Sequence, residues 1–159
     1  MELKLEQIEG TVQVRRGGGE WSAAQVGDDL RASDAVRTLE GSYAVIIGGE
    51  AVKVRMEPGT EVSVQELTDS LSRLMLENGM TRVNVNPGTH QTFEMRAAKS
   101  DAVARTTGGV FTLSNNGSGT VALATLEGDT TFSGQHKVVI VHAHQQSVIR
   151  PGQQPSEPA

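Results

Sequence analysis

Hydrophobic residues alternate with polar ones over short stretches of this chain, and glycine-rich breaks separate those stretches. The alternation is clearest at 3–14 and 51–55, and 43–47 is a short apolar run. A period of two places alternate side chains on one face of a β-strand. The breaks recur about every eight to twelve residues, a spacing typical of sandwiches, barrels and solenoids. The pattern therefore predicts an all-β fold.

The stretch 65–77 is the least clear part of the first half. Its apolar residues Leu67, Leu71, Leu74 and Met75 have helix-like spacing. The residues 74–79 also read as a strand that ends in a hairpin turn at Asn78-Gly79. We favour a strand from 72 onward, with 83–85 as the return strand after that turn.

The second half continues the rhythm of strands and turns. Extended segments are predicted at 92–95, 102–106, 110–113 and 120–126, and Glu127-Gly128-Asp129 is read as another turn. The near-continuous apolar run 137–141 predicts a strand that is covered on both faces. The fold class is therefore all-β, a solenoid-like arrangement or a double-stranded β-helix or sandwich of many short antiparallel strands.

The 159 residues predict one domain, which we place at 1–150. The segment 151–159 has three prolines in nine residues, so it is expected to be a tail or the start of a linker. The first residues lack the apolar region of a signal peptide, and no apolar run approaches the ~20 residues of a membrane helix. We therefore expect no membrane insertion in this segment, which would fit either a soluble chain or a piece of a longer exported protein.

The amino-acid composition excludes several classes of function. The chain has one Trp, one Tyr and three Phe, so the core must be built mainly from Val, Leu, Ile and Ala. A net charge of −5 and the shortage of aromatic rings argue against nucleic-acid binding. The absence of cysteine excludes disulfides, thiolate metal sites and a cysteine nucleophile. No Gly-x-Ser-x-Gly elbow is present, and the sequence predicts no enzyme and no cofactor.

Three histidines near the C-terminal end form the sharpest candidate for chemistry. His142 and His144 are two residues apart and would share one face of a strand, and His136 is a candidate third ligand. Cupin enzymes use such a pair, but they add a carboxylate and a later histidine that this chain lacks. We therefore expect no metal site and keep a cupin-like metal-binding protein as an alternative.

Two aromatic residues are candidates for ligand contact. Trp21 is the only indole and offers a large face on which a sugar ring can stack. A lone Trp more often plugs the end of a small β core, which is the favoured interpretation here. Tyr43 has the same two interpretations.

The first half of the chain resembles the FecR protein domain. The matching residues are Gly10 to Val14, Trp21, Gly27-Asp28-Asp29-Leu30, Asp34 to Thr38, Ser42 to Ile46, the glycine turn at 48–49, and Val52-Lys53-Val54. The later half matches more loosely at 102–106, 111–113, 121–123, 127–128 and 151–152. Ser33 stands where the family commonly has glycine, and Ala104-Arg105-Thr106-Thr107 stands where it often has Val-Arg-Gly-Thr.

The resemblance implies an extracytoplasmic all-β domain, in the periplasm or cell envelope. On this basis the chain is expected to be a non-catalytic binding or scaffolding module that acts through an exposed sheet face or its edges. Its expected partners are an envelope protein or a glycan, and self-association through edge strands is a further expectation. The alternative is a periplasmic sensor fragment of a transmembrane anti-sigma regulator.

Overall fold

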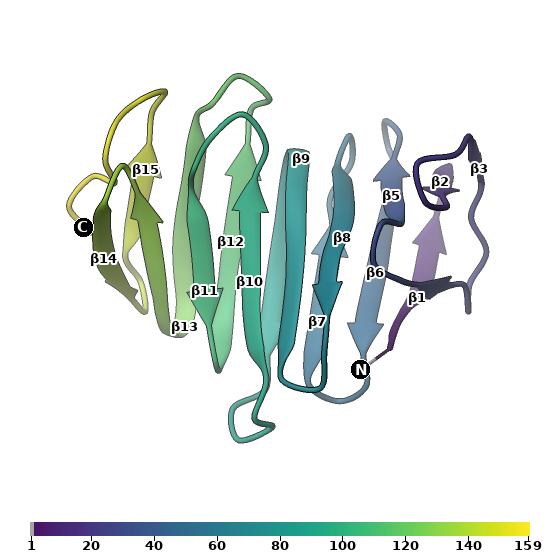
Figure 1. Cartoon of the computed structure of the whole chain (residues 1–159), viewed down its shortest axis with the longest axis horizontal. Helices are drawn as coiled ribbons and strands as arrows, with labels where there is room; N and C mark the ends of the chain where they lie inside the picture. Colours follow the sequence, from purple (N-terminus) through teal and green to yellow (C-terminus); the bar gives the residue numbers. More distant parts are fainter. Residues whose placement is uncertain (1) are drawn as a thin grey trace.

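The computed structural model describes residues 2–159, which form fifteen strands and no helix (Figure 1). The all-β prediction is confirmed. The part of the chain that the structure describes contains no helix able to span a membrane. The strands are β1 (Leu3–Glu9), β2 (Val12–Arg15), β3 (Trp21–Ala23), β4 (Asp29–Leu30), β5 (Ala35–Thr38), β6 (Tyr43–Gly48), β7 (Val52–Met56), β8 (Glu61–Leu67), β9 (Leu71–Val85), β10 (Thr92–Ala97), β11 (Val103–Thr106), β12 (Gly109–Asn115), β13 (Val121–Gly134), β14 (Lys137–His142) and β15 (Gln146–Ile149).

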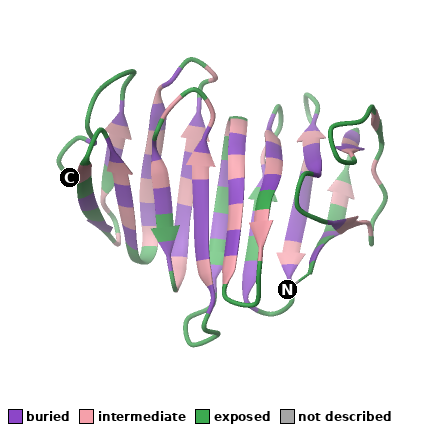
Figure 2. Cartoon of the chain, in the orientation of Figure 1, coloured by how far each residue is buried: buried purple, intermediate pink, exposed green. Residues whose placement is uncertain are grey.

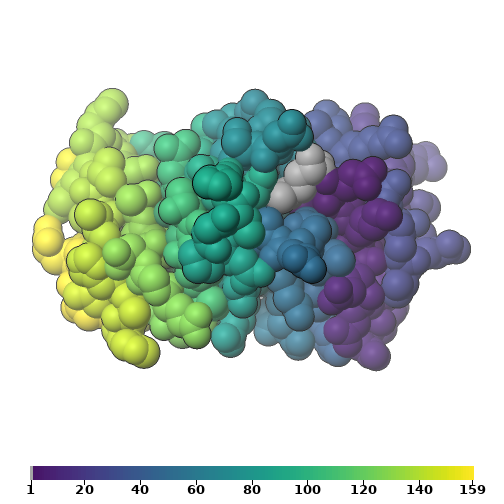
Figure 3. Space-filling model, turned by 90° about the horizontal axis from the view of Figure 1, so that it is seen from below, coloured from purple at the N-terminus to yellow at the C-terminus, as the bar shows by residue number. Residues whose placement is uncertain are grey.

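The strands form two layers, here called sheet A and sheet B. Sheet A has the order β4-β1-β6-β7-β9-β12-β13-β15. Sheet B has the order β3-β2-β5-β8-β9-β10-β11-β13-β14. Every pair is antiparallel except β9 and β10, which run parallel. The chain advances along the long axis of the molecule, so its first and last strands lie at opposite ends (Figures 1 and 3).

Two long strands belong to both sheets. The first part of β9 pairs with β8 and β10 in sheet B, and its second part pairs with β7 and β12 in sheet A. β13 crosses in the same way, from β12 and β15 in sheet A to β11 and β14 in sheet B. The strands β9, β10, β11, β13 and β12 therefore close into a ring, and the other strands extend from it.

The ring corrects the finer part of the fold prediction. A regular solenoid or a double-stranded β-helix would repeat one coil along the axis. Here a small closed ring of five strands is flanked by strands outside it, so neither description clearly applies. The prediction of many short, mostly antiparallel strands holds for the rest of the molecule.

The two strands cross between the sheets at residues where the sequence predicts turns. The predictions of turns at 78–79 and 127–129 are therefore wrong, because β9 and β13 continue through these residues. Gly79 has a φ of 100° and Gly128 a φ of 71°, both in the left-handed region that glycine adopts without a steric cost. A Cβ on Gly79 would lie 2.3 Å from Oγ1 of Thr60, and one on Gly128 would lie 2.6 Å from the carbonyl oxygen of Gly108. Each glycine bends a continuous strand into the facing sheet, and 83–85 is the end of β9 rather than a separate strand.

The core lies between the two sheets and follows the expected composition. Aliphatic side chains from both inner faces fill it, together with three fully buried rings, Phe93, Phe111 and Phe132. The ring centroids of Phe93 and Phe111 are 6.1 Å apart, within the range of favourable aromatic pairs. These rings come from β10, β12 and β13, so the aromatic part of the core lies inside the closed ring of strands.

The apolar run at 137–141 differs from its prediction. It forms most of β14, but only Val139 and Val141 are buried. Val138 and Ile140 point away from the core and are 65% and 52% exposed, and exposed bands alternate with buried ones along this strand (Figure 2). The strand is therefore covered on one face only, because nothing in residues 2–159 lies over its outer face.

The segment 151–159, here called the C-terminal segment, contains no assigned strand but follows β15. Gln146 and Ala159 exchange two backbone hydrogen bonds of 3.2 Å, and Ser156 donates one of 2.9 Å to Val148. Pro155 is buried, and Nζ of Lys137 lies 2.7 Å from a carboxylate oxygen of Glu157. The C-terminal segment therefore extends sheet A by one position beyond β15.

A carboxylate organises the turn before β5. Asp34 accepts hydrogen bonds from Nη1 of Arg16 and from the backbone N–H groups of Arg31 and Gly17. Burial raises the pKa of this carboxyl, but these hydrogen bonds outweigh it and hold the pKa below its ordinary value. The neighbouring Ser33 has a φ of 79°, which explains physically why glycine suits this position.

Candidate functional site

A broad hollow lies on the outer face of sheet A, at the middle of the molecule. It has a volume of about 660 Å³ and is open to solvent. Side chains from β1, β6, β7, β9 and β12 line it, together with Glu57, which follows β7. The lining residues are Gln7, Val45, Lys53, Arg55, Glu57, Met80, Thr81, Arg82, Asn84 and Thr112. We call this surface the basic hollow.

Three cations dominate the basic hollow. Lys53 and Arg55 are the outward-facing residues of β7, and Arg82 faces outward from β9. The register places Arg55 directly opposite Arg82, and Lys53 opposite Asn84. Among residues 2–159, no acidic side chain forms an ion pair with Lys53 or Arg82. Two like charges directly opposite one another on a sheet repel, so this arrangement does not serve stability.

Arg55 is held in place by two neighbours. Its Nε donates a 2.6 Å hydrogen bond to Glu57, which raises the pKa of the guanidinium. Its guanidinium carbon lies 4.1 Å from the ring centre of Tyr43, within the range of a cation–π contact. The hydroxyl of Tyr43 accepts a 2.8 Å hydrogen bond from Gln7, another lining residue. Tyr43, a candidate for ligand contact, therefore lies beside the basic hollow and positions one of its cations.

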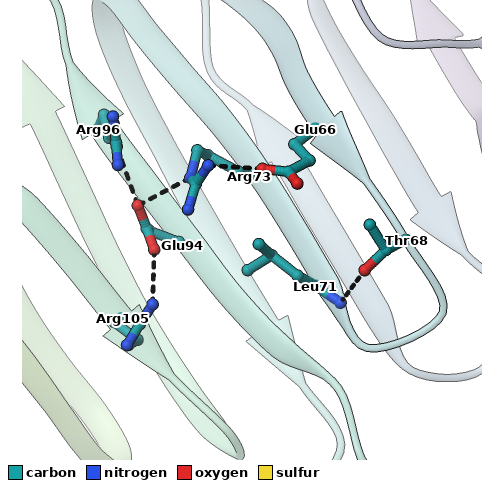
Figure 4. Close-up of polar contacts among 7 residues, drawn as sticks. All are labelled: Glu66, Thr68, Leu71, Arg73, Glu94, Arg96 and Arg105. Carbon is teal, nitrogen blue, oxygen red and sulfur yellow. Dashed lines mark hydrogen bonds and ion pairs between the residues drawn. The ribbon is translucent and has the colours of Figure 1, made fainter.

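A second polar cluster lies on the outer face of sheet B (Figure 4). Glu94 of β10 accepts hydrogen bonds from Arg73, Arg96 and Arg105, at 3.0, 2.9 and 3.0 Å, and Arg73 also donates to Glu66 at 2.6 Å. The Glu94 side chain is only 3% exposed because the three arginines cover it. Burial raises the pKa of Glu94, and the hydrogen bonds from Arg96, Arg73 and Arg105 lower it below its ordinary value. The charges of this cluster are paired with one another, and the cluster links four strands, β8, β9, β10 and β11.

Trp21, the other predicted contact residue, also lies outside the core. It is half-buried on β3, and the guanidinium carbons of Arg37 and Arg15 lie 4.3 and 4.9 Å from its ring centre. The prediction that this Trp plugs the end of the core is not what the structure shows. Its ring is instead covered by cations, and Trp21 does not line the basic hollow.

The three histidines do not converge. His136 lies in the turn before β14 and His142 at the other end of that strand, roughly 20 Å away at the usual rise of a strand. His144 has a φ of 71° in the following turn, so it does not share a strand face with His142. Nδ1 of His142 lies 2.6 Å from a carboxylate oxygen of Asp129. No group of three or more metal-ligating side chains occurs among residues 2–159.

The sequence interpretation missed the two charged clusters. Lys53 and Arg55 are visible as the outward residues of an alternating strand, but their proximity to Arg82 depends on the pairing of β7 with β9. Glu94 likewise meets its three arginines only through the order β9-β10-β11. A search for basic residues on the polar faces of the predicted strands would have found Lys53, Arg55, Arg73 and Arg105. Arg82 and Arg96 lie just outside those strands, and the carboxylates would not have been found.

Comparison with known proteins gives a likeness in fold. No family model matches the chain, and no curated protein matches it. Two crystal structures, at 1.65 and 2.50 Å resolution, of a "putative anti-sigma factor" from Parabacteroides distasonis are similar to it. Their TM-score is 0.66, with 14% and 15% sequence identity over 77% of this chain. The chain corresponds to 59% of the length of those structures.

Proposed function

We propose that this domain is a non-catalytic recognition module that binds an acidic segment of a partner protein in the basic hollow. The observation that carries the proposal is the direct opposition of Arg55 and Arg82, with Lys53 beside them. A carboxylate bound between the two guanidiniums would replace their mutual repulsion by charge-assisted hydrogen bonds. The chain as a whole carries a net charge of −5, but in the hollow three cations face a single carboxylate, Glu57.

The hollow has the make-up of a binding surface rather than a reaction centre. Its one carboxylate, Glu57, is already hydrogen-bonded to Arg55, and no histidine lines it. Thr112 and Asn84 supply neutral hydrogen-bonding groups, and Met80, which is 42% exposed, supplies an apolar contact. This mixture suits a peptide segment that has acidic side chains next to an apolar one.

A protein partner fits better than a glycan. Sugar rings are usually bound by stacking on an open aromatic face. The two candidate rings for that role, Tyr43 and Trp21, already stack against guanidinium groups in this structure. An uncharged sugar would also gain little from the two opposed arginines.

We place this module in the periplasm or the cell envelope, because of the resemblance to the FecR domain. The fold shared with the anti-sigma factor structures supports a regulatory version of the same function. In that version the acidic segment belongs to a receptor, and the domain is the sensor part of a longer anti-sigma regulator. In the scaffolding version the partner is a structural envelope protein.

Binding is tested by fluorescence anisotropy with a labelled decapeptide of alternating Glu and Leu, titrated with the domain at low salt. The Lys53→Gln/Arg82→Gln variant should bind the peptide about 5- to 30-fold more weakly, because each exposed cation that is removed contributes about 0.5–1 kcal/mol to the binding free energy. The matched control is Lys99→Gln/Arg150→Gln, which removes the same charge away from the hollow and should bind like the unaltered protein.

Other outcomes would count against the proposal. Equal weakening by the control pair would mean that only the overall charge matters. Tight binding of polygalacturonate, with no binding of the acidic peptide, would assign the hollow to an anionic glycan instead. A peptide with Gln in place of Glu that binds equally well would remove the role of the cations.

The sensor version is tested in cells of the source organism. A chromosomal Lys53→Glu/Arg82→Glu allele should change transcription of the genes controlled by an alternative sigma factor. Unchanged transcript levels, with the acidic-peptide affinity lost, would leave recognition without a regulatory role and favour the scaffold.

A further inference from the structure

The open edge of sheet B at β14 is a second surface, distinct from the basic hollow. Most other sheet ends in the described chain are short or covered. β3 and β4 have three and two residues, and β15 is paired with the C-terminal segment. β14 has six residues and pairs on one side only, with β13. It also carries the exposed side chains of Val138 and Ile140.

The backbone of β14 offers free hydrogen-bonding groups at the same residues. Gln135 and His136 form the two-residue turn between β13 and β14, and both have positive φ, as in a type I′ hairpin. The closing pair of such a hairpin is hydrogen-bonded, so the partners of β13 are Lys137, Val139 and Val141.

The hydrogen bonds at the other end of β14 are consistent with this assignment. The backbone N–H of His142 donates to the side chain of Gln145 rather than to β13. The N–H and C=O groups of Val138 and Ile140 therefore point outward in the plane of the sheet, and no partner for them occurs among residues 2–159.

The C-terminal segment shapes the space beside this edge. β14 and β15 occupy equivalent positions, because each is the next strand after β13 in its own sheet. The C-terminal segment extends sheet A one position further, and it is linked to the sheet B side by Lys137–Glu157 and by Gln154, which donates to the carbonyl of Gln135. Among residues 2–159, sheet B has no strand at that position. A strand added there would lie about 4.8 Å from β14, beside the C-terminal segment.

We propose that this place accepts one extended segment of a partner protein, which adds to sheet B as a strand beside β14. Such a segment would hydrogen-bond to Val138 and Ile140 and would place apolar side chains next to theirs. The geometry disfavours a second copy paired edge to edge, because each copy carries its own C-terminal segment. That segment would occupy the position that β15 of the other copy requires.

The test uses a peptide of seven alternating Thr and Val residues with a lysine at each end, and the same peptide with every backbone nitrogen methylated. The first peptide should slow hydrogen exchange at the amides of Val138 and Ile140 at least tenfold at millimolar concentration. In the methylated peptide both hydrogen-bonding edges are blocked, so it should give no protection.

Two variants separate strand addition from simple apolar contact. Ile140→Pro removes an N–H that points away from β13, so the fold should persist while peptide binding falls at least tenfold. Ile140→Thr keeps the backbone group and should change binding by about threefold or less. The Lys53→Gln/Arg82→Gln variant should bind this peptide normally, which separates this inference from the proposed function.

Three results would overturn the inference. One is the absence of protection at Val138 and Ile140 in a folded protein. Another is equal protection by the methylated peptide. The third is dimerisation of the domain alone, in sedimentation measurements, that Ile140→Pro abolishes, since it would assign this edge to a second copy.

Discussion

Replacing Glu94 by Gln should destabilise the domain by about 2.5 kcal/mol at pH 7. The change removes the charge on which Arg73, Arg96 and Arg105 converge. Hydrogen bonds to a buried charge contribute about 1.5–3 kcal/mol, whereas pairs with exposed partners contribute about 0.2–1 kcal/mol. The three arginine side chains are 24%, 43% and 53% exposed, so we assign about 1.5 kcal/mol to Arg73 and about 0.5 kcal/mol to each of the others.

The loss should also depend on pH. The pKa of Glu94 is lowered in the folded protein, so its contribution to stability is fully present above the ordinary pKa of 4.5. That contribution is lost as the pH falls through the lowered pKa of the folded state. The gap in unfolding free energy between the original protein and Glu94→Gln should therefore be largest near neutral pH and should narrow in acid.

Urea unfolding at several pH values measures this gap, with the fluorescence of the single Trp21 and circular dichroism as paired probes. Glu66→Gln is the graded comparison, because Glu66 holds only Arg73 and is itself half-exposed, and it should cost less than 1 kcal/mol. Glu40→Gln, at an exposed loop position, should be neutral. A loss below about 0.5 kcal/mol for Glu94→Gln, or a loss that is constant down to pH 3, would refute the reasoning.

Three further substitutions test other parts of the structure. Gly79→Ala should cost about 3 kcal/mol or prevent folding, because its Cβ would lie 2.6 Å from the Cα of Thr60 at a φ of 100°, and expression with urea unfolding measures this. Arg82→Gln should raise the unfolding free energy by about 0.3 kcal/mol by relieving the repulsion from Arg55, and the gain should disappear in 1 M NaCl. Ser33→Gly should stabilise the domain by about 1 kcal/mol, which calorimetry would detect as an increase in Tm of roughly 2–4 °C.

Much of the strand pattern could be predicted from the sequence, because alternation and glycine punctuation are local signals. The bends in β9 and β13 could not. An Asn-Gly pair after an apolar run codes equally well for a hairpin and for a strand that turns into the facing sheet. At Gly79 the outcome depends on close contact with Thr60, and at Gly128 on contact with Gly108. These residues are remote in sequence, so no local window contains the information.

For the candidate surfaces, too, the sequence carries the local signals but not the contacts between strands. The polar face of a single strand can be predicted from the alternation of residues, as for Lys53 and Arg55 on β7. That these residues belong to a cluster of cations is evident only from the strand register, which places Arg82 opposite Arg55. The exposed side of β14 was misjudged for a related reason. The run 137–141 has the composition of a strand covered on both faces. Val138 and Ile140 are in solvent because no other part of residues 2–159 covers the outer face of sheet B at β14.

The central strand β9 determines how this domain would carry a mechanical load. In the described residues, β9 is the only strand that pairs with both the N-terminal strands, through β7 and β8, and the C-terminal strands, through β10 and β12. A pulling force applied between the two ends of the molecule must therefore pass across the ladders of hydrogen bonds between β9 and its neighbouring strands. These ladders lie along the two halves of a single strand in opposite sheets, so they share the force and resist it together. Rupture at β9 would separate the molecule into an N-terminal and a C-terminal half in one step.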